Sequence, residues 1–198
     1  MIEYLRDPKA IYARSFAIIR AETSFSHLPR DCEAVAARIV HACGMPEIAA
    51  DLRISSNFCK AAKRAIRTGR GILVDAEMVR HGIIDKSLKV ICTLNYASAN
   101  GTTRSAAAVE LWRPHLEGAL VVVGNAPTAL FALLDLIDAG APRPAAIVGF
   151  PVGFVGAAES KAELHRNPRG TPYATLLGRK GGSAMAAAVI NALTQNAA

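Results

Sequence analysis

The segment RIVHACGM places His41 two residues before Cys43 and three before Gly44. Histidine transfers protons readily near neutral pH, and together with cysteine it can bind zinc. Side chains two positions apart on a helix do not face each other, and the sequence offers no second pair of ligands, so zinc is disfavoured. Two interpretations of His41 stay open, an ordinary exposed histidine on a helix and a proton donor.

The helix expected around this histidine runs from about Asp31 to Cys43. Its apolar residues repeat at helical spacing and form one stripe: Cys32, Val35, Ala36, Ile39, Val40 and Cys43. His41 lies roughly opposite this stripe, beside the small residues Ala34 and Ala37, which leave room for a large flat ligand. Gly44 ends the helix, and the negative end of the helix dipole favours a protonated His41.

Three further segments are candidates for binding an anion, and each joins a predicted strand to a predicted helix: VVVGNAPTAL, IVGFPVGFVGAAESK and LLGRKGGSAM. Glycine permits close backbone approach, and the first N–H groups of a helix attract negative charge. We therefore expect ligand contacts at Gly124, Asn125, Gly153 and Lys180. The alternative is that these glycines only form tight turns. The phosphate-binding and dinucleotide-binding glycine patterns are both missing from the sequence, so a nucleotide site is disfavoured.

Short apolar runs alternate with helical stretches along the chain, which predicts a parallel sheet with crossover helices. The strand candidates are GILVD, KVICTL, ALVVVGN, AAIVGFP and the weaker PYATLL. A first helix is expected from Pro8, capped by Asp7, to about Ala21. We expect a three-layer α/β/α domain over residues 1–198, with a mainly parallel sheet of about five strands whose carboxyl ends bind the ligand.

The chain has 198 residues and a formal net charge of +7, from 23 basic and 16 acidic residues. This charge suits an anionic partner, either nucleic acid or a small polycarboxylate or phosphate. The basic residues do not form the runs that bind nucleic acid, so nucleic acid is not expected. A small anionic ligand and a basic surface that only keeps the protein soluble both stay open.

The amino-terminal segment MIEYLRDPKA is charged where a secretion signal is apolar. The longest uncharged run, ALVVVGNAPTALFALL, is too short to span a bilayer, so no membrane association is expected. The four cysteines, Cys32, Cys43, Cys59 and Cys92, are scattered without a C-x-x-C pair. We therefore expect a cytoplasmic protein whose cysteines are reduced thiols.

Taken together, the motifs resemble the precorrin-8X methylmutase family of cobalamin (vitamin B12) biosynthesis, including its cobalt-dependent counterpart, cobalt-precorrin-8 methylmutase. The resemblance covers nearly the whole chain. It is carried by YLRDPKAIYARSFAIIRAE, RIVHACG, ILVDAEMV, VICTL, TTRSAAA, VVVGNAPTALFALL, GFPVGFVGAAESK and GRKGGSAMAAAVINAL.

The resemblance implies a flavodoxin-like domain that works as a homodimer, with the active site near the subunit interface. It implies an isomerase that moves a methyl group between adjacent carbons of one ring of a tetrapyrrole, converting precorrin-8X into hydrogenobyrinate without a cofactor or metal. By their places in the family motifs, His41 is the catalytic residue, and Ser15 and Arg104 line the substrate site. A flat ring bearing several carboxylates suits a basic protein, and one acid suffices to assist the shift.

Three alternatives stay open, and one of them is an unrelated flavodoxin-like binder of phosphate or flavin. The protein could be a carrier that holds hydrogenobyrinate for the next enzyme of the corrin pathway without catalysing the shift. Its natural substrate could instead be cobalt-precorrin-8, because the two pathways use closely similar enzymes.

Overall fold

The computed structural model describes residues 2–194 and contains one sheet of six strands. The strands are β1 (Leu52–Ile54), β2 (Ile72–Val74), β3 (Val90–Cys92), β4 (Leu120–Val123), β5 (Ala146–Gly149) and β6 (Tyr173–Leu176). Their order in the sheet is β1-β6-β5-β4-β2-β3. Neighbours among β2 to β6 are parallel, whereas β1 runs antiparallel to β6 and aligns Leu52 with Leu176.

The parallel part of the sheet confirms the expected fold class. Its five strands are the five predicted from the sequence, and counted along the chain they have the order of flavodoxin-like sheets. The expected number of about five strands is one too low, because β1 was not predicted. β1 has only three residues, and its central Arg53 is half-buried, so it carries no apolar run that distinguishes it from a loop.

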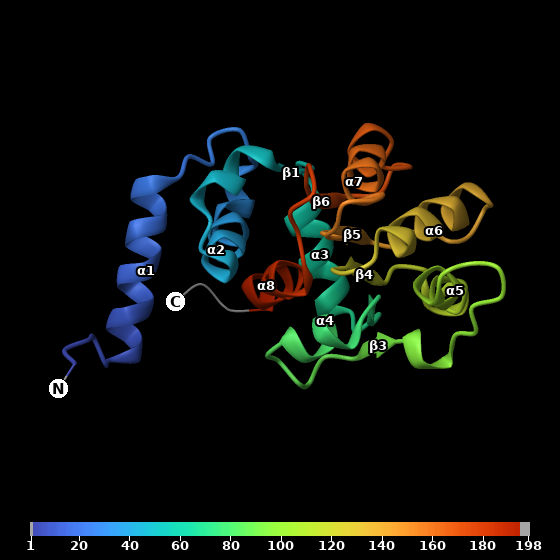
Figure 1. Ribbon diagram of the computed structural model, residues 1–198, viewed down its shortest axis with the longest axis horizontal. Helices are drawn as coiled ribbons and strands as arrows, with labels where there is room; N and C mark the ends of the chain where they lie inside the picture. Colours follow the sequence, from blue (N-terminus) through green and yellow to red (C-terminus); the bar gives the residue numbers. More distant parts are fainter. Residues whose placement is uncertain (1, 195–198) are drawn as a thin grey trace.

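Eight α-helices connect or cover the strands in the described part of the chain (Figure 1). They are α1 (Pro8–Glu22), α2 (Glu33–Cys43), α3 (Phe58–Arg67), α4 (Glu77–Gly82), α5 (Arg104–Glu110), α6 (Pro127–Asp138), α7 (Ala157–Arg166) and α8 (Ser183–Thr194). Short 3₁₀ helices lie at Arg30–Cys32, Pro46–Asp51, Leu94–Tyr96 and Arg113–His115. Residues 1 and 195–198 of the expected domain lie outside the described range.

The sheet separates two hydrophobic layers, because successive residues of a strand point to opposite faces. In β4, Leu120 and Val122 pack into the layer that includes α2, α3, α4 and α8. Val121 and Val123 of the same strand pack into the other layer, with α5, α6 and α7. The expected three-layer arrangement is therefore confirmed. Within residues 2–194, no helix combines the length and the apolar character that crossing a bilayer requires.

Helix α1 lies outside these layers, at the blue end of the ribbon, and packs against α2 (Figure 1). As predicted, Asp7 caps this helix, with its Oδ1 accepting the N–H of Ala10 at 2.7 Å. Phe16 and Ile19 are the buried residues of α1 and fix it to α2. The rest of α1 is largely exposed, so this helix presents a free surface beside the carboxyl-terminal half of α2.

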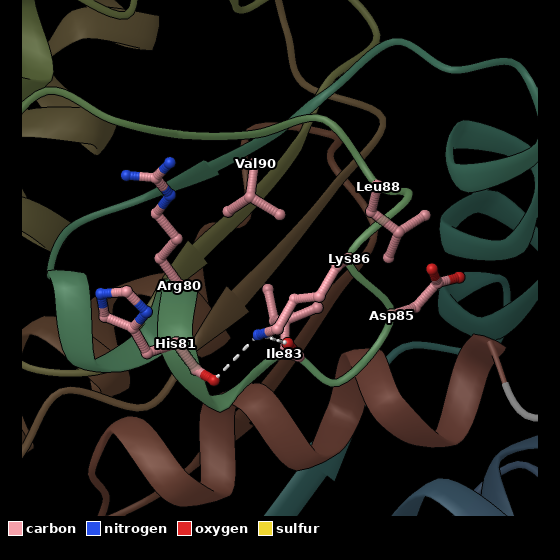
Figure 2. Close-up of a pocket in the computed structure, with 7 residues that line it drawn as sticks. All are labelled: Arg80, His81, Ile83, Asp85, Lys86, Leu88 and Val90. Atoms are coloured by element: carbon pink, nitrogen blue, oxygen red, sulfur yellow. Dashed lines mark hydrogen bonds between the residues drawn. The ribbon is translucent and has the colours of Figure 1, made fainter.

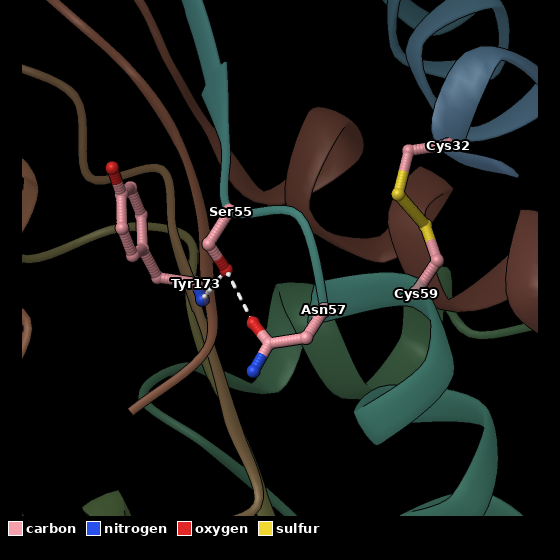
Figure 3. The surroundings of a disulfide bond; sticks show 5 residues. All are labelled: Cys32, Ser55, Asn57, Cys59 and Tyr173. Carbon is pink, nitrogen blue, oxygen red and sulfur yellow. Dashed lines mark hydrogen bonds between the residues drawn. A yellow bond between two sulfur atoms is a disulfide. The ribbon is translucent and has the colours of Figure 1, made fainter. Parts of the chain in front are cut away.

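The cysteines differ from the expectation of four reduced thiols. Cys32 and Cys59 form a disulfide across 27 positions of sequence, whereas Cys43 and Cys92 are free (Figure 3). The fold brings the starts of α2 and α3 together and sets the two Cα atoms 5.9 Å apart, within disulfide range. The spacing of the two cysteines in the sequence does not reveal that they lie close together. Asp31 lies beside the two sulfur atoms, but sulfurs bonded to each other are not thiolate ligands for a metal.

Candidate active site

His41 and Ser15 lie side by side where α2 meets α1. The Oγ of Ser15 is 2.9 Å from Nδ1 of His41, although the residues are 26 positions apart. His41 belongs to the last turn of α2, which ends as predicted at Gly44 with a left-handed φ of 67°. The two helices therefore bring together two of the residues that the sequence assigns to one site.

Aromatic rings from α1 support the imidazole. The ring of Phe16 stacks on His41 with centroids 5.1 Å apart and an interplanar angle of 20°. The ring centroids of Tyr12 and His41 are 6.0 Å apart, and the hydroxyl of Tyr12 accepts a 2.6 Å hydrogen bond from Arg38. The sequence reasoning did not identify these three supporting residues. Their contacts depend on the pairing of α1 with α2, which no local pattern reveals.

The electrostatic setting of His41 differs from the expectation. Its pKa is lowered from the ordinary value, first because partial burial disfavours the cation and second because Arg38 carries a nearby positive charge. Both effects act against the cation, in the direction opposite to that expected from the helix dipole. Of the two alanines expected beside it, Ala34 is exposed but Ala37 is buried.

Arg104 is not near this pair in a single chain. It begins α5, which packs on the opposite face of the sheet from α2 (Figure 1). Arg104 follows β3, whereas the loop after β6 contacts the segment after α2 through Lys180 and Glu47. Four strand spacings of about 4.8 Å separate β6 from β3, or about 19 Å. Arg104 is exposed and has no salt bridge with any described residue.

The first glycine-rich segment is held by a buried carboxylate that the sequence reasoning did not assign. Asp75, directly after β2, accepts the N–H groups of Gly124 at 2.8 Å, Asn125 at 3.0 Å and Ala126 at 2.8 Å. Burial raises the pKa of Asp75, while the three N–H groups oppose that shift by stabilising the carboxylate. The backbone groups that were expected to face a ligand are therefore already occupied. The sequence signal that could have identified Asp75 is a carboxylate directly after a fully apolar strand.

Gly124 has a packing role. A Cβ at this position would lie 2.6 Å from Val79 and 2.8 Å from Ala186, so only glycine fits between β4, α4 and α8. Asn125 is different, because its side chain is half-buried and forms no hydrogen bond with the described residues. Within this segment, Asn125 is the residue whose side chain is available to a ligand.

The other two glycine-rich segments bind each other. The N–H of Gly153 donates to the carbonyl of Arg179, and the N–H of Gly182 donates to that of Phe150. Lys180 is exposed, and its amine lies 2.8 Å from Glu47, which raises the pKa of Lys180. Its carbonyl accepts a hydrogen bond from the buried Lys161 at 2.5 Å. The loops after β4, β5 and β6 thus form a connected rim at the carboxyl edge of the sheet.

A hollow of about 270 Å³ lies at the β3 edge of the sheet, between α4 and β3 (Figure 2). It is lined by Arg80, His81, Ile83, Asp85, Lys86, Leu88 and Val90. The amine of Lys86 donates to the carbonyls of His81 and Ile83, so it stabilises the turn that follows α4. The volume is below the range of typical ligand sites. None of the residues predicted for the site lines this hollow.

Comparison with known proteins identifies the family. Residues 10–196 match the family model described as precorrin-8X methylmutase. The chain is 55% identical over 203 residues to the precorrin-8X methylmutase of Pseudomonas aeruginosa, with 98% of each chain covered. It is 50% identical to that of a Sinorhizobium species, over 98% of this chain and 97% of the relative.

More distant relatives agree with this assignment. A cobalt-precorrin-8 methylmutase of Methanothermobacter thermautotrophicus is 41% identical over 81% of this chain and 78% of the relative. The solved structure of the precorrin-8X methylmutase from Thermus thermophilus has a TM-score of 0.85 at 37% identity, covering 93% of this chain and 94% of that one. The chain described here belongs to the precorrin-8X methylmutase family.

Proposed function

We propose that this protein is an isomerase of cobalamin biosynthesis that converts precorrin-8X into hydrogenobyrinate, with His41 as the proton donor. The methyl group moves between adjacent carbons of one ring. An isomerisation leaves the composition and oxidation state of the substrate unchanged, so the proposed reaction needs no external oxidant, reductant or group donor. The observation that carries the role of His41 is its geometry: Phe16 stacks on the imidazole and Ser15 contacts its Nδ1, while the ring stays exposed to a ligand.

Ser15 suits both protonation states of His41. Its hydroxyl accepts from Nδ1–H both in the charged imidazole and after Nε2 has given up its proton, and it donates to Nδ1 in the neutral tautomer that carries the proton on Nε2. The ring therefore keeps one orientation while Nε2 gives a proton to the macrocycle and regains it after the methyl shift. In the free protein, burial and Arg38 lower the pKa of His41. Carboxylates of the bound substrate oppose both effects, so we propose that substrate binding protonates His41.

We further propose that the protein acts as a homodimer. Exposed apolar residues gather on α1 and the segment before it: Ile2, Tyr4, Leu5, Ile11, Tyr12 and Ile18. This surface adjoins His41, and its burial against a second copy of the chain would remove large apolar side chains from water. Arg104 lies on the opposite face of the sheet in the same chain. We propose that Arg104 of one subunit binds a substrate carboxylate beside His41 of the other.

Mixed dimers test this arrangement. His41→Ala and Arg104→Ala subunits are each expected to be inactive as homodimers. If each site uses His41 and Arg104 from different subunits, a mixed dimer has one intact site and one site that lacks both residues. Turnover then returns to about one half of the wild-type value per mixed dimer. If both residues act within one chain, every site of the mixed dimer lacks one residue and turnover stays absent.

We propose the metal-free tetrapyrrole as the substrate. The compared relatives named for precorrin-8X are 55% and 50% identical to this chain, against 41% for the first relative named for cobalt-precorrin-8. Absorption spectra recorded with precorrin-8X and with cobalt-precorrin-8 test the choice. Faster conversion of the metal-free compound supports it, and faster conversion of the cobalt compound contradicts it. Binding of either compound without a change to the product spectrum would instead indicate a carrier.

A further inference from the structure

Asp75 occupies the place where flavodoxin-like sheets usually bind ligands. That place lies outside the carboxyl ends of two neighbouring strands whose following helices cover opposite faces of the sheet. Here the strands are β2 and β4, followed by α4 in one layer and α6 in the other. The side chain of Asp75 is 2% exposed and fills the space between the two strand ends.

Three converging N–H groups make this place an anion cradle, which we define as the backbone N–H groups of Gly124, Asn125 and Ala126. The cradle opens α6, whose N-cap residue Ala126 has no side-chain cap. The carboxylate of Asp75 satisfies these donors and supplies the negative charge that a helix N-terminus favours. The protein thus fills its own anion site.

The position of Asn125 depends on this carboxylate. Its N–H is bound by Asp75, and its carbonyl accepts the N–H of Val152 from the next loop at 3.3 Å. Its side-chain amide has no partner among the described residues and is half-buried at the rim. Asp75 itself is too buried to touch a substrate. Any effect of Asp75 on the reaction must therefore pass through the segment that it holds.

We infer that Asp75 is a positioning residue for the proposed reaction, because it fixes Asn125 at the substrate rim and keeps substrate carboxylates out of the anion cradle. This inference rests on the proposed function. A polycarboxylate substrate offers many groups that fit three N–H donors, so an empty cradle would bind the substrate in the wrong place. The filled cradle leaves the Asn125 amide to select one carbonyl or carboxylate at the rim.

Four variants separate this role from a general loss of stability. Asp75→Ala empties the cradle, and Asp75→Asn keeps the shape of the side chain while removing its charge. Asn125→Ala removes the amide that Asp75 is inferred to position. Thr175→Val is the matched control, because Thr175 is also buried near the rim and donates to the carbonyl of Gly149, outside the cradle.

The expected result is a rise in KM of roughly tenfold for Asp75→Ala, the size of one lost hydrogen bond to a carboxylate. Asn125→Ala raises KM by a similar factor, and the double variant raises KM by less than the product of the two single effects. Acetate at millimolar concentration lowers the KM of Asp75→Ala toward wild type, because the half-buried Asn125 and Ala126 let it reach the empty cradle. Acetate does not lower the KM of Thr175→Val.

Multiplied effects in the double variant, or no response of Asp75→Ala to acetate, would overturn the inference. If Asp75→Ala does not fold, the same comparison with Asn125→Ala is made with Asp75→Asn. The melting temperature of Asp75→Ala in acetate and in chloride gives a readout that needs no substrate, and a specific rise in acetate is expected. If the wild type does not convert precorrin-8X, the proposed function fails, while the acetate effect still tests the cradle.

Discussion

Ser15 Oγ lies 2.9 Å from His41 Nδ1, and this contact joins α1 to the last turn of α2. A hydroxyl in this place serves as donor or acceptor, so it orients the imidazole before and after proton transfer. The same helix supplies Phe16, which limits the ring to one plane. The site thus depends on how α1 sits against α2.

Replacing Ser15 by alanine is expected to lower kcat by roughly tenfold to a hundredfold, because the imidazole loses the contact that orients it. Ser15→Thr is the control, since it keeps the hydroxyl. Steady-state rates with precorrin-8X measure the effect. Equal rates for wild type and Ser15→Ala would exclude an orienting role.

Removing the charge of Arg38 is expected to shift the pH profile. Arg38 lowers the pKa of His41, so Arg38→Gln raises that pKa toward its ordinary value of about 6.5. A proton donor works in its charged form, so kcat/KM falls as the pH rises through this pKa. The alkaline limb of the kcat/KM profile therefore moves to higher pH in Arg38→Gln and stays in place in Arg38→Lys. A shift to lower pH contradicts the assignment of His41 as an acid.

The Cys32–Cys59 disulfide can be tested by counting the free thiols of the protein before and after reduction. Unfolded protein kept from reductant should give two free thiols per chain, from Cys43 and Cys92, and four after reduction. Reduction should also lower the melting temperature, since a loop of this length is worth roughly 3–4 kcal/mol in the chain-entropy description. The Cys32→Ser/Cys59→Ser variant serves as control, because its melting temperature should not respond to reductant. Four free thiols before reduction would show that Cys32 and Cys59 are not bonded.

Because Lys161 is buried, we expect the stability of the protein to depend on pH. Burial lowers its pKa from 10.5 to about 8, so the folded protein binds fewer protons than the unfolded chain between these two values. Lys161 therefore lowers the free energy of unfolding by its full amount below pH 8. This destabilisation decreases as the pH rises from 8 to 10.5, so the protein becomes more stable over that range. Urea unfolding across this range should show a smaller rise for Lys161→Met than for wild type. Lys60→Met, at an exposed position on α3, should keep the full rise.

The sequence was sufficient for the elements with strong patterns. The apolar runs of β2 to β6 and the cap at Asp7 follow from local composition, and the structure confirms them. The three-residue β1 and the six-residue α4 (Glu77–Gly82) are too short to carry a clear periodicity, and neither was predicted.

The site was predictable only in part. His41 was singled out by its residue type and its place at a helix end, and Ser15 by motif resemblance; the fold brings them together. The interaction of Asp75 with Gly124 spans 49 positions, and the Cys32–Cys59 bond spans 27. Such contacts depend on the relative placement of whole elements, which residue types and spacing do not encode locally.

The electrostatics of the site were the least predictable feature. The position of His41 at a helix end suggested a cation, but burial and Arg38 act in the opposite direction. Likewise, the glycine-rich segments suggested free N–H groups, whereas Asp75 occupies those of Gly124 and Asn125. In both cases the deciding group comes from a different part of the structure.

The most direct test of His41 is a single-turnover measurement with His41→Ala. The variant should bind hydrogenobyrinate about as tightly as wild type, while conversion of precorrin-8X falls by roughly 10²- to 10⁴-fold. His81→Ala, at an exposed histidine on α4, should convert the substrate at the wild-type rate. Wild-type conversion by His41→Ala would contradict the account, because the proposed proton would then have another source.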